Sequence, residues 1–218
     1  MKRAISLTAA RTAYAVNRAN EHEVIWSPLY DFQTYAAAGQ TSLSFFQVQQ
    51  GQSSKTLADT NMEAAGALPA PKHFLCTGIQ VAFFTGNTPG STGDRTVAAT
   101  APGRNWTDVN AVFKSGWLRL FIGSKDYLVD APIGVFPPDF RLAGAAAVTD
   151  QTTAAATSFS QIDYASFAGK PYEITPVFIP SQQNFVVKLE WPTAVALPSA
   201  VAGRIGIRLL GYLYRLSQ

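Results

Sequence analysis

Hydrophobic and polar residues alternate with a period of two along much of the chain after residue 22. The clearest run is residues 185–191, in which every second side chain is large and apolar, as at Val187, Leu189 and Trp191. Successive side chains of a strand point to opposite faces, so this pattern is typical of a half-buried strand in an antiparallel sheet. Residues 203–216 begin with the same alternation and end almost wholly apolar, which predicts a long closing strand.

The pattern predicts about eight strands and no internal helix longer than two turns. Four of these strands are expected to form two hairpins, which pair residues 117–122 with 127–133 and residues 172–179 with 185–191. The other strands are predicted at residues 23–32 (around Pro28), 42–49, 74–85 and 203–216. We therefore predict an all-β fold of antiparallel sheets.

The chain is expected to divide into an arm and one β domain. Residues 2–20 contain neither Gly nor Pro and place apolar residues such as Ile5 and Val16 at helical spacing, which predicts a helical arm. A length of 218 residues suits one large β domain. We place the arm at residues 1–22 and the domain at residues 23–218.

Three long connections separate the predicted strands, at residues 50–73, 86–108 and 138–170. They are rich in Gly, Ala, Ser, Thr and Pro, and poor in charge. Residues 59–67 are compatible with a short helix, and residues 143–157 are nearly of low complexity. Connections of this length are uncommon in compact domains unless they are functional or disordered.

Charge is distributed unevenly between the arm and the domain. The first 18 residues hold no acid and four bases, which are Lys2, Arg3, Arg11 and Arg18. Subtracting these four from the 17 basic residues of the chain leaves 13, against 14 acidic residues, in residues 19–218. The arm is therefore a candidate to contact an anionic partner, either nucleic acid or a membrane surface, or to dock on a neighbouring subunit.

The low content of charged residues indicates that other subunits cover much of the protein surface. Charged residues make up 14% of the chain, against roughly 25% in an average soluble domain. No run of about 18 apolar residues occurs, so no transmembrane helix is expected, and Arg11 and Arg18 interrupt any signal-peptide core. Cys76 stands alone among apolar neighbours, which predicts a buried, inert thiol.

No group of residues in the sequence indicates catalysis, so we expect no enzyme activity, no cofactor and no metal. Histidine occurs only as His22 and His73, too few for a triad or a zinc site. A carboxylate site is the alternative at Asp126, Asp130 and Asp139, although Asp126 is more simply a turn residue.

Exposed aromatic side chains that could stack on sugars or bases are another candidate site. Most aromatic residues fall on alternating strand positions, which favours core packing. Trp106 lies in a predicted loop, within the glycosylation sequon 105–107, and is the best exposed candidate.

Residues 174–191 (ITPVFIPSQQNFVVKLEW) resemble a hairpin of the major capsid proteins of tailless icosahedral bacterial viruses. The similarity is one of pattern and organisation and covers roughly residues 23–218: strands in hairpin pairs, long uncharged loops and a basic N-terminal arm. It implies a jelly-roll sandwich or barrel. Many of those proteins carry two jelly rolls, and 218 residues favour one.

The resemblance also implies a function. The chain would be a structural capsid protein that self-assembles through low-charge lateral interfaces into an icosahedral shell, in the virion, after assembly in the host cytoplasm. Its partners would be copies of itself and other virion proteins. The arm would face inward, towards genome nucleic acid or an internal membrane, or would bridge subunits.

Two alternatives stay open. One is a carbohydrate-binding or adhesin β-sandwich module of a virion spike or tail, which would need an exposed aromatic platform such as Trp106. The other is an enzyme on a jelly-roll scaffold, such as a cupin or a glycosidase. Two distant histidines argue against a cupin, which needs several histidine ligands.

Overall fold

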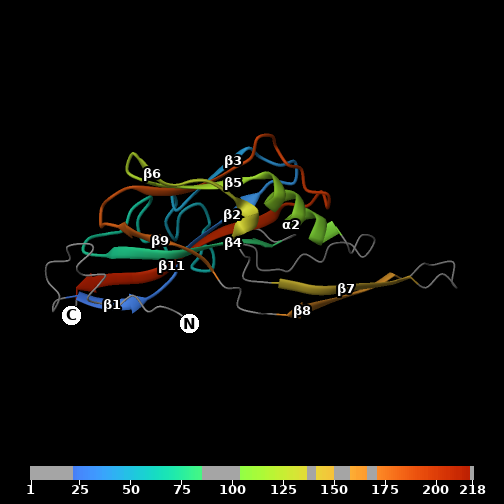
Figure 1. Cartoon of the computed structure of the whole chain (residues 1–218), viewed down its shortest axis with the longest axis horizontal. Coiled ribbons are helices and arrows are strands. Elements are labelled where there is room, and N and C mark those ends of the chain that lie inside the picture. Colours follow the sequence, from blue (N-terminus) through green and yellow to red (C-terminus); the bar gives the residue numbers. More distant parts are fainter. Residues whose placement is uncertain (1–21, 85–103, 137–140, 150–157, 166–170, 217–218) are drawn as a thin grey trace.

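The computed structural model describes residues 22–84, 104–136, 141–149, 158–165 and 171–216. In these ranges the chain forms two large antiparallel sheets, which lie one above the other in Figure 1, with one α-helix beside them. The predicted all-β class is confirmed. The predicted arm lies outside the described residues, except for its last residue, His22.

The larger sheet has five strands: β1 (His22–Trp26), β2 (Leu29–Tyr35), β4 (His73–Phe84), β9 (Tyr172–Ile179) and β11 (Gly203–Leu216). The order is β1-β11-β4-β9, and β2 also pairs with β11. The long strand β11 therefore holds β1 along its C-terminal part and β2 along its N-terminal part, on the same side.

The smaller sheet has four strands: β3 (Ser42–Phe45), β5 (Trp117–Ile122), β6 (Lys125–Pro132) and β10 (Phe185–Glu190). The order is β3-β10-β5-β6, and every pair is antiparallel. Strands β5 and β6 form the first predicted hairpin, which is confirmed.

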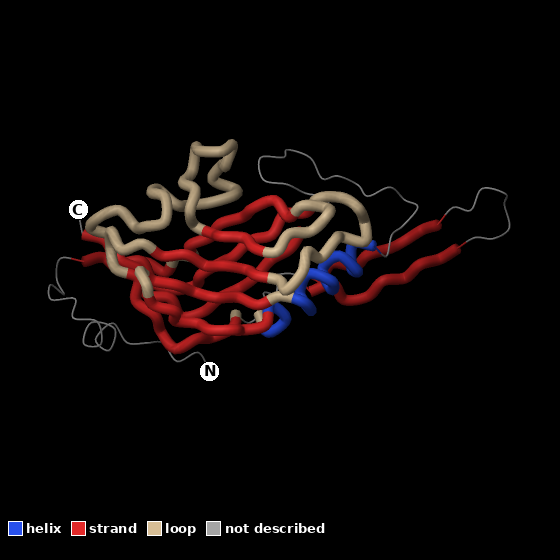
Figure 2. Tube along the Cα trace, turned by 90° about the horizontal axis from the view of Figure 1, so that it is seen from above, coloured by secondary structure: helices blue, strands red, loops and turns tan. Residues whose placement is uncertain are grey.

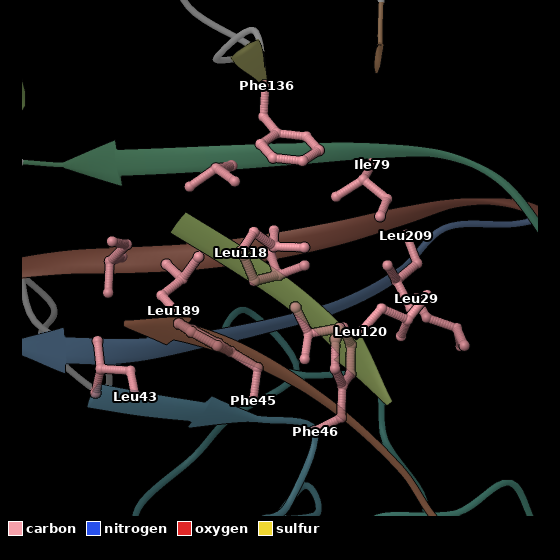
Figure 3. Packing of buried hydrophobic residues seen from close by; sticks show 14 of the residues in the cluster. Leu29, Leu43, Phe45, Phe46, Ile79, Leu118, Leu120, Phe136, Leu189 and Leu209 are labelled. Carbon is pink, nitrogen blue, oxygen red and sulfur yellow. The ribbon is translucent and has the colours of Figure 1, made fainter. Parts of the chain in front are cut away.

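The core lies between the two sheets. Leu118, Leu120 and Leu189 of the smaller sheet and Ile79 and Leu209 of the larger sheet point into it (Figure 3) and are fully buried. Burying one such side chain stabilises a fold by about 1.5–3 kcal/mol. For residues 185–191 and for the first part of 203–216, the alternation therefore predicted the inner face correctly.

The second predicted hairpin is wrong. Both strands exist, but β9 pairs with β4 in the larger sheet whereas β10 pairs with β3 and β5 in the smaller sheet. Residues 180–184 cross between the sheets, and the amide of Gln182 donates to the carbonyl of Leu68 at 2.8 Å. Alternation shows that a segment is a strand, and a short connection does not decide whether its two strands pair.

The expectation of no helix longer than two turns is also wrong. Helix α2 (Arg104–Ser115) spans 12 residues and lies against the end of the sandwich (Figure 2). Val109, Val112 and Phe113 pack on the core at the helical spacing i, i+3, i+4. Tertiary packing thus outweighs the modest helix propensity of the Asn, Thr and Val residues.

The third predicted connection is not a plain loop. It contains a two-stranded hairpin, β7 (Arg141–Thr149) and β8 (Ser158–Ala165), which extends beyond the two sheets in Figures 1 and 2. Antiparallel pairing uses backbone groups that every residue except Pro supplies in full. Ala-rich and Thr-rich sequence therefore does not prevent a ladder.

The strand predicted at 42–49 ends early, because Phe46 has a φ of 69°. A positive φ in a bulky residue breaks an extended strand. The amide of Phe46 instead donates to Oδ2 of Asp31 at 2.7 Å. The following connection, residues 50–73, contains turns, and the short helix predicted at 59–67 does not form.

Candidate functional site

The four basic residues predicted as an anion contact, Lys2, Arg3, Arg11 and Arg18, lie outside the described residues. Their role remains a prediction. The other candidates from the sequence can be placed in part.

His73 and Cys76 both have packing roles. Nδ1 of His73 accepts a hydrogen bond from the Ser181 amide at 3.1 Å, and its ring stacks on Phe178 at 5.5 Å. Burial raises the pKa of Cys76 to about 12, so the thiol stays protonated at neutral pH. Within the described ranges, no three His, Cys, Asp or Glu side chains come together as a metal site.

The carboxylate candidates do not form a described pair. Oδ2 of Asp126 accepts from Nη2 of Arg119 at 2.8 Å, and Arg119 also covers the ring of Phe121 at 4.7 Å. Asp126 lies at the start of β6 and makes a structural ion pair. The backbone of Asp130 is in β6, and Asp139 lies outside the described residues.

Trp106 does not lie in a loop. The backbone of residues 105–107, including the sequon, forms the first turn of α2. The expectation of a loop is wrong because the apolar face of this helix, with Val112 at its centre, is held by the core.

An open groove lies between β9 and the turn that joins β5 to β6, and its volume is about 980 Å³. Tyr127 and Tyr172, which are 47% and 39% exposed, stand in its lining with the polar side chains of Lys125, Glu173 and Gln183. The groove can accept a ligand that combines a flat apolar face with hydroxyl or charged groups.

The ring of Tyr172 is held in place from one side. Phe136 packs on it edge to face, with ring centroids 5.1 Å apart and planes at 67°. Sequence reasoning missed this groove, because alternation assigned both tyrosines to strands and gave no sign that two strands of different sheets meet there. The signal available was that each of the two predicted strands, 127–133 and 172–179, begins with a tyrosine.

The outer face of the larger sheet, away from the core, carries aromatic and basic side chains. The guanidinium carbon of Arg204 lies 4.1 Å from the ring centroid of Phe32, and that of Arg208 lies 5.8 Å away. Burial lowers the pKa of Arg208. Nη2 of Arg204 lies 3.0 Å from Oδ1 of Asp59, so this cation already has an anionic partner within the chain.

Residues 56–61, which we call the cover segment, run along the outer edge of β2. The amide of Phe32 donates to the carbonyl of Asp59 at 2.8 Å, and Asp31 forms an antiparallel bridge with Thr60. Asn61 accepts from the amide of Tyr30 at 3.0 Å and donates to the carbonyl of Pro28 at 2.8 Å. The edge of β2 is therefore closed by the chain itself.

A buried ion pair ties the same region to the core. Nζ of Lys55 donates to Oδ1 of Asp31, which is fully buried. Burial raises the pKa of Asp31, while the hydrogen bond and charge of Lys55 and the Phe46 amide act in the opposite direction. This pair sits behind the cover segment, away from solvent, so we assign it to stability.

The edge of β1 has a different character. Trp26 is 63% exposed, and Leu216, opposite His22 on β11, is 45% exposed. Val24 packs beside Leu75 and Tyr214 in a small apolar cluster on the outer face. In the described part of the chain, β11 is the strand that pairs with β1.

The described residues thus define an all-β protein of two packed antiparallel sheets, with an open groove beside β9 and a bare edge at β1. No helix among them is long and apolar enough to span a membrane. No protein-family model matches this chain, and no curated protein matches it either.

Proposed function

We propose that the fold is a single jelly roll. Support comes from the strand pairing of the two large sheets, with β1 and β2 counted as one strand. The first strand then pairs with the eighth (β11), the second with the seventh, the third with the sixth and the fourth with the fifth. A long hairpin rolled into two sheets has this nested pairing, which characterises jelly rolls.

The corrected hairpin supports this proposal. In a nested pairing the sixth and seventh strands belong to different sheets, so residues 180–184 have to cross between them, as they do between β9 and β10. Helix α2 and the β7–β8 hairpin are then insertions between the third and fourth and between the fifth and sixth strands.

We propose that the chain is a structural capsid protein that self-assembles into an icosahedral shell. The nested strand pairing is the observation that carries this proposal, because jelly rolls are widely used in viral capsids. The low charge content and the exposed apolar edge of β1 add support, since extensive subunit contacts bury such surface.

In this proposal the chain resides in the virion, and its partners are copies of itself and other virion proteins. The arm, residues 1–22, faces inward or bridges subunits. Lys2, Arg3, Arg11 and Arg18 supply its positive charge. They contact genome nucleic acid or an internal membrane as a secondary role. The proposal requires no catalytic group, cofactor or metal.

The test is the assembly state of the purified chain. Size-exclusion chromatography with light scattering and negative-stain microscopy should show large closed oligomers. A monomer that persists at high concentration across salt conditions would contradict the proposal. Deletion of residues 1–18 should leave the β domain folded, as measured by circular dichroism, and impair assembly.

A second candidate is a carbohydrate-binding or adhesin module, and the groove favours it. Its volume of about 980 Å³ and its two exposed tyrosines suit a sugar ring that stacks on an aromatic side chain. A glycan array should then show binding that Tyr127→Ala and Tyr172→Ala weaken. Trp26→Ala is the control, because Trp26 is an aromatic residue that is even more exposed than the two tyrosines and lies outside the groove. Binding that all three variants retain would rule out the groove.

A further inference from the structure

Sheet edges are sites of unwanted pairing, and proteins usually protect them with proline, bulges, short strands or a covering segment. Strand β2 has its cover segment, β3 is four residues long, and β9 contains Pro176. Strand β6 ends in Pro132 and has register shifts against β5. Strand β1, with sequence HEVIW, is also short at five residues, but within the described residues it has no proline, no register shift against β11 and no covering segment.

The hydrogen-bonding direction of β1 follows from its register. Trp26 is opposite Tyr212, so Ser27 continues the ladder opposite Gly211, and its amide donates to the carbonyl of Gly211 at 3.2 Å. Hydrogen-bonded and non-hydrogen-bonded pairs alternate along an antiparallel ladder. Glu23 and Ile25 therefore turn their backbone groups towards β11. The N–H and C=O groups of His22, Val24 and Trp26 point to the open edge.

We propose that β1 pairs antiparallel with β1 of a second copy of this chain, around a two-fold axis at Val24. Val24 then lies opposite Val24 of the partner subunit, and His22 lies opposite Trp26 of the partner subunit. The residues that face each other are the ones whose backbone groups point outward. The two five-stranded sheets become one continuous sheet.

The charges of the strand permit this pairing. Glu23 is the one acidic residue of β1, and its Oε2 accepts from Nε of Arg215 at 2.8 Å within the same subunit. In the two-fold register Glu23 lies opposite Ile25 of the partner subunit, so no like charges meet. The exposed indole of Trp26 gains cover from the partner's strand.

This inference rests on the proposed assembly function and deepens it, because it names one surface through which copies meet. It commits to a second copy as the occupant of the edge. Pairing by residues that precede β1 in the same chain is the competing outcome, and it would leave the edge closed in a monomer.

A disulfide at the two-fold axis tests the register in the full chain. Cα atoms of a hydrogen-bonded antiparallel pair lie about 5.5 Å apart, which is within the range for a disulfide. The native thiol, Cys76, is buried and is not expected to compete. Val24→Cys should give a crosslinked dimer under mild oxidation, and Thr34→Cys should not. Thr34 is the matched control because it is exposed on β2 of the same sheet.

A charge swap provides a second measurement in case the cysteine is unreactive. Val24→Lys and Val24→Glu should each lose the dimer, because like charges meet at the axis, and an equimolar mixture should regain it. Near-ultraviolet circular dichroism checks that each variant folds. Absence of crosslinking together with a mixture that stays monomeric would overturn the inference.

The two proposals fail separately. Shells that form without a Val24→Cys crosslink, and that also form from Val24→Lys or Val24→Glu alone, would overturn the β1 pairing and leave the capsid proposal standing. A crosslinked dimer that never grows into larger particles would support the pairing and contradict the capsid proposal.

Discussion

Strands β1 and β2 lie on the same side of β11, yet in the described part of the chain another segment covers only the outer edge of β2. The edge of β2 is closed by the cover segment, residues 56–61, and backed by the buried pair of Asp31 and Lys55. The edge of β1 is bare in the described part of the chain and ends in the exposed Trp26. One half of this sheet edge is closed within the subunit, and the other half is the edge at which we propose that a second copy pairs.

The change occurs at Ser27 and Pro28. The amide of Ser27 still donates to Gly211 of β11, whereas Pro28 has no amide hydrogen and its carbonyl accepts from Asn61 of the cover segment. Pro28 therefore separates β1 from β2, and it marks the point at which the cover segment begins to close the edge. The predictions below test this division.

The largest effect is expected when the covered edge loses its cation. Lys55→Ala leaves the carboxylate of Asp31 buried and unpaired, which should lower the free energy of unfolding by about 3–5 kcal/mol in urea denaturation. Lys72→Ala is the control. The Lys72–Glu63 ion pair is exposed, and its loss should cost at most about 1 kcal/mol.

A double variant sharpens this result. Asp31→Asn combined with Lys55→Met removes both charges and should recover much of the loss, because the penalty comes from an unpaired buried charge. Equal losses in Lys55→Ala and Lys72→Ala would show that the buried pair does not stabilise the covered edge.

At the covered edge, the strand could be predicted from the sequence, but the ion pair behind it could not. Alternation predicted the strand, and Asp31 shares its parity with the core residues Leu29 and Tyr35. A carboxylate on a buried face requires a partner, and that signal was available. Its partner Lys55 could not be identified, because it lies 24 residues away in a segment shaped by turns with positive φ at Ser53 and Ser54.

The same limit applies to the bare edge and to the groove. The segments of β1, β9 and β11 could be read as strands, because their side chains alternate or are apolar. The strands that pair with them could not be predicted, because pairing in this fold joins residues far apart in sequence, such as Val24 and Tyr214. The position of β1 at the sheet edge and the residues that line the groove both depend on this strand order.

A smaller effect is expected from Asn61, which binds the cover segment to β2 through its side chain. Asn61→Ala removes the bonds to the Tyr30 amide and the Pro28 carbonyl and should lower the free energy of unfolding by about 1–3 kcal/mol. Gln40→Ala is the control, since its exposed bond to the Thr34 carbonyl is solvent-replaceable. Similar losses in the two variants would contradict the assigned role of Asn61.

The pH dependence of stability should report on Asp31. Burial raises the pKa of this carboxyl above its ordinary value of 3.8. The native state then binds more protons than the unfolded state between 3.8 and the raised pKa, so the contribution of Asp31 to stability falls as pH rises through that window. Urea denaturation of the wild type and Asp31→Asn at successive pH values measures the difference. The free energy of unfolding of the wild type, relative to that of Asp31→Asn, should fall as pH rises through the window. A relative stability that rises with pH instead would contradict the raised pKa.

The smallest effect on stability is expected at the bare edge, where Trp26 is 63% exposed. Trp26→Ala should change the free energy of unfolding by no more than about 0.5 kcal/mol, as for other surface positions, and should weaken self-association measured by sedimentation. Leu57→Ala is the matched control, because Leu57 is 58% exposed on the cover segment. It should leave both stability and association unchanged. If Leu57→Ala weakened association as much as Trp26→Ala, general apolar exposure rather than the edge of β1 would drive self-association. The difference between the two edges would then have no functional meaning.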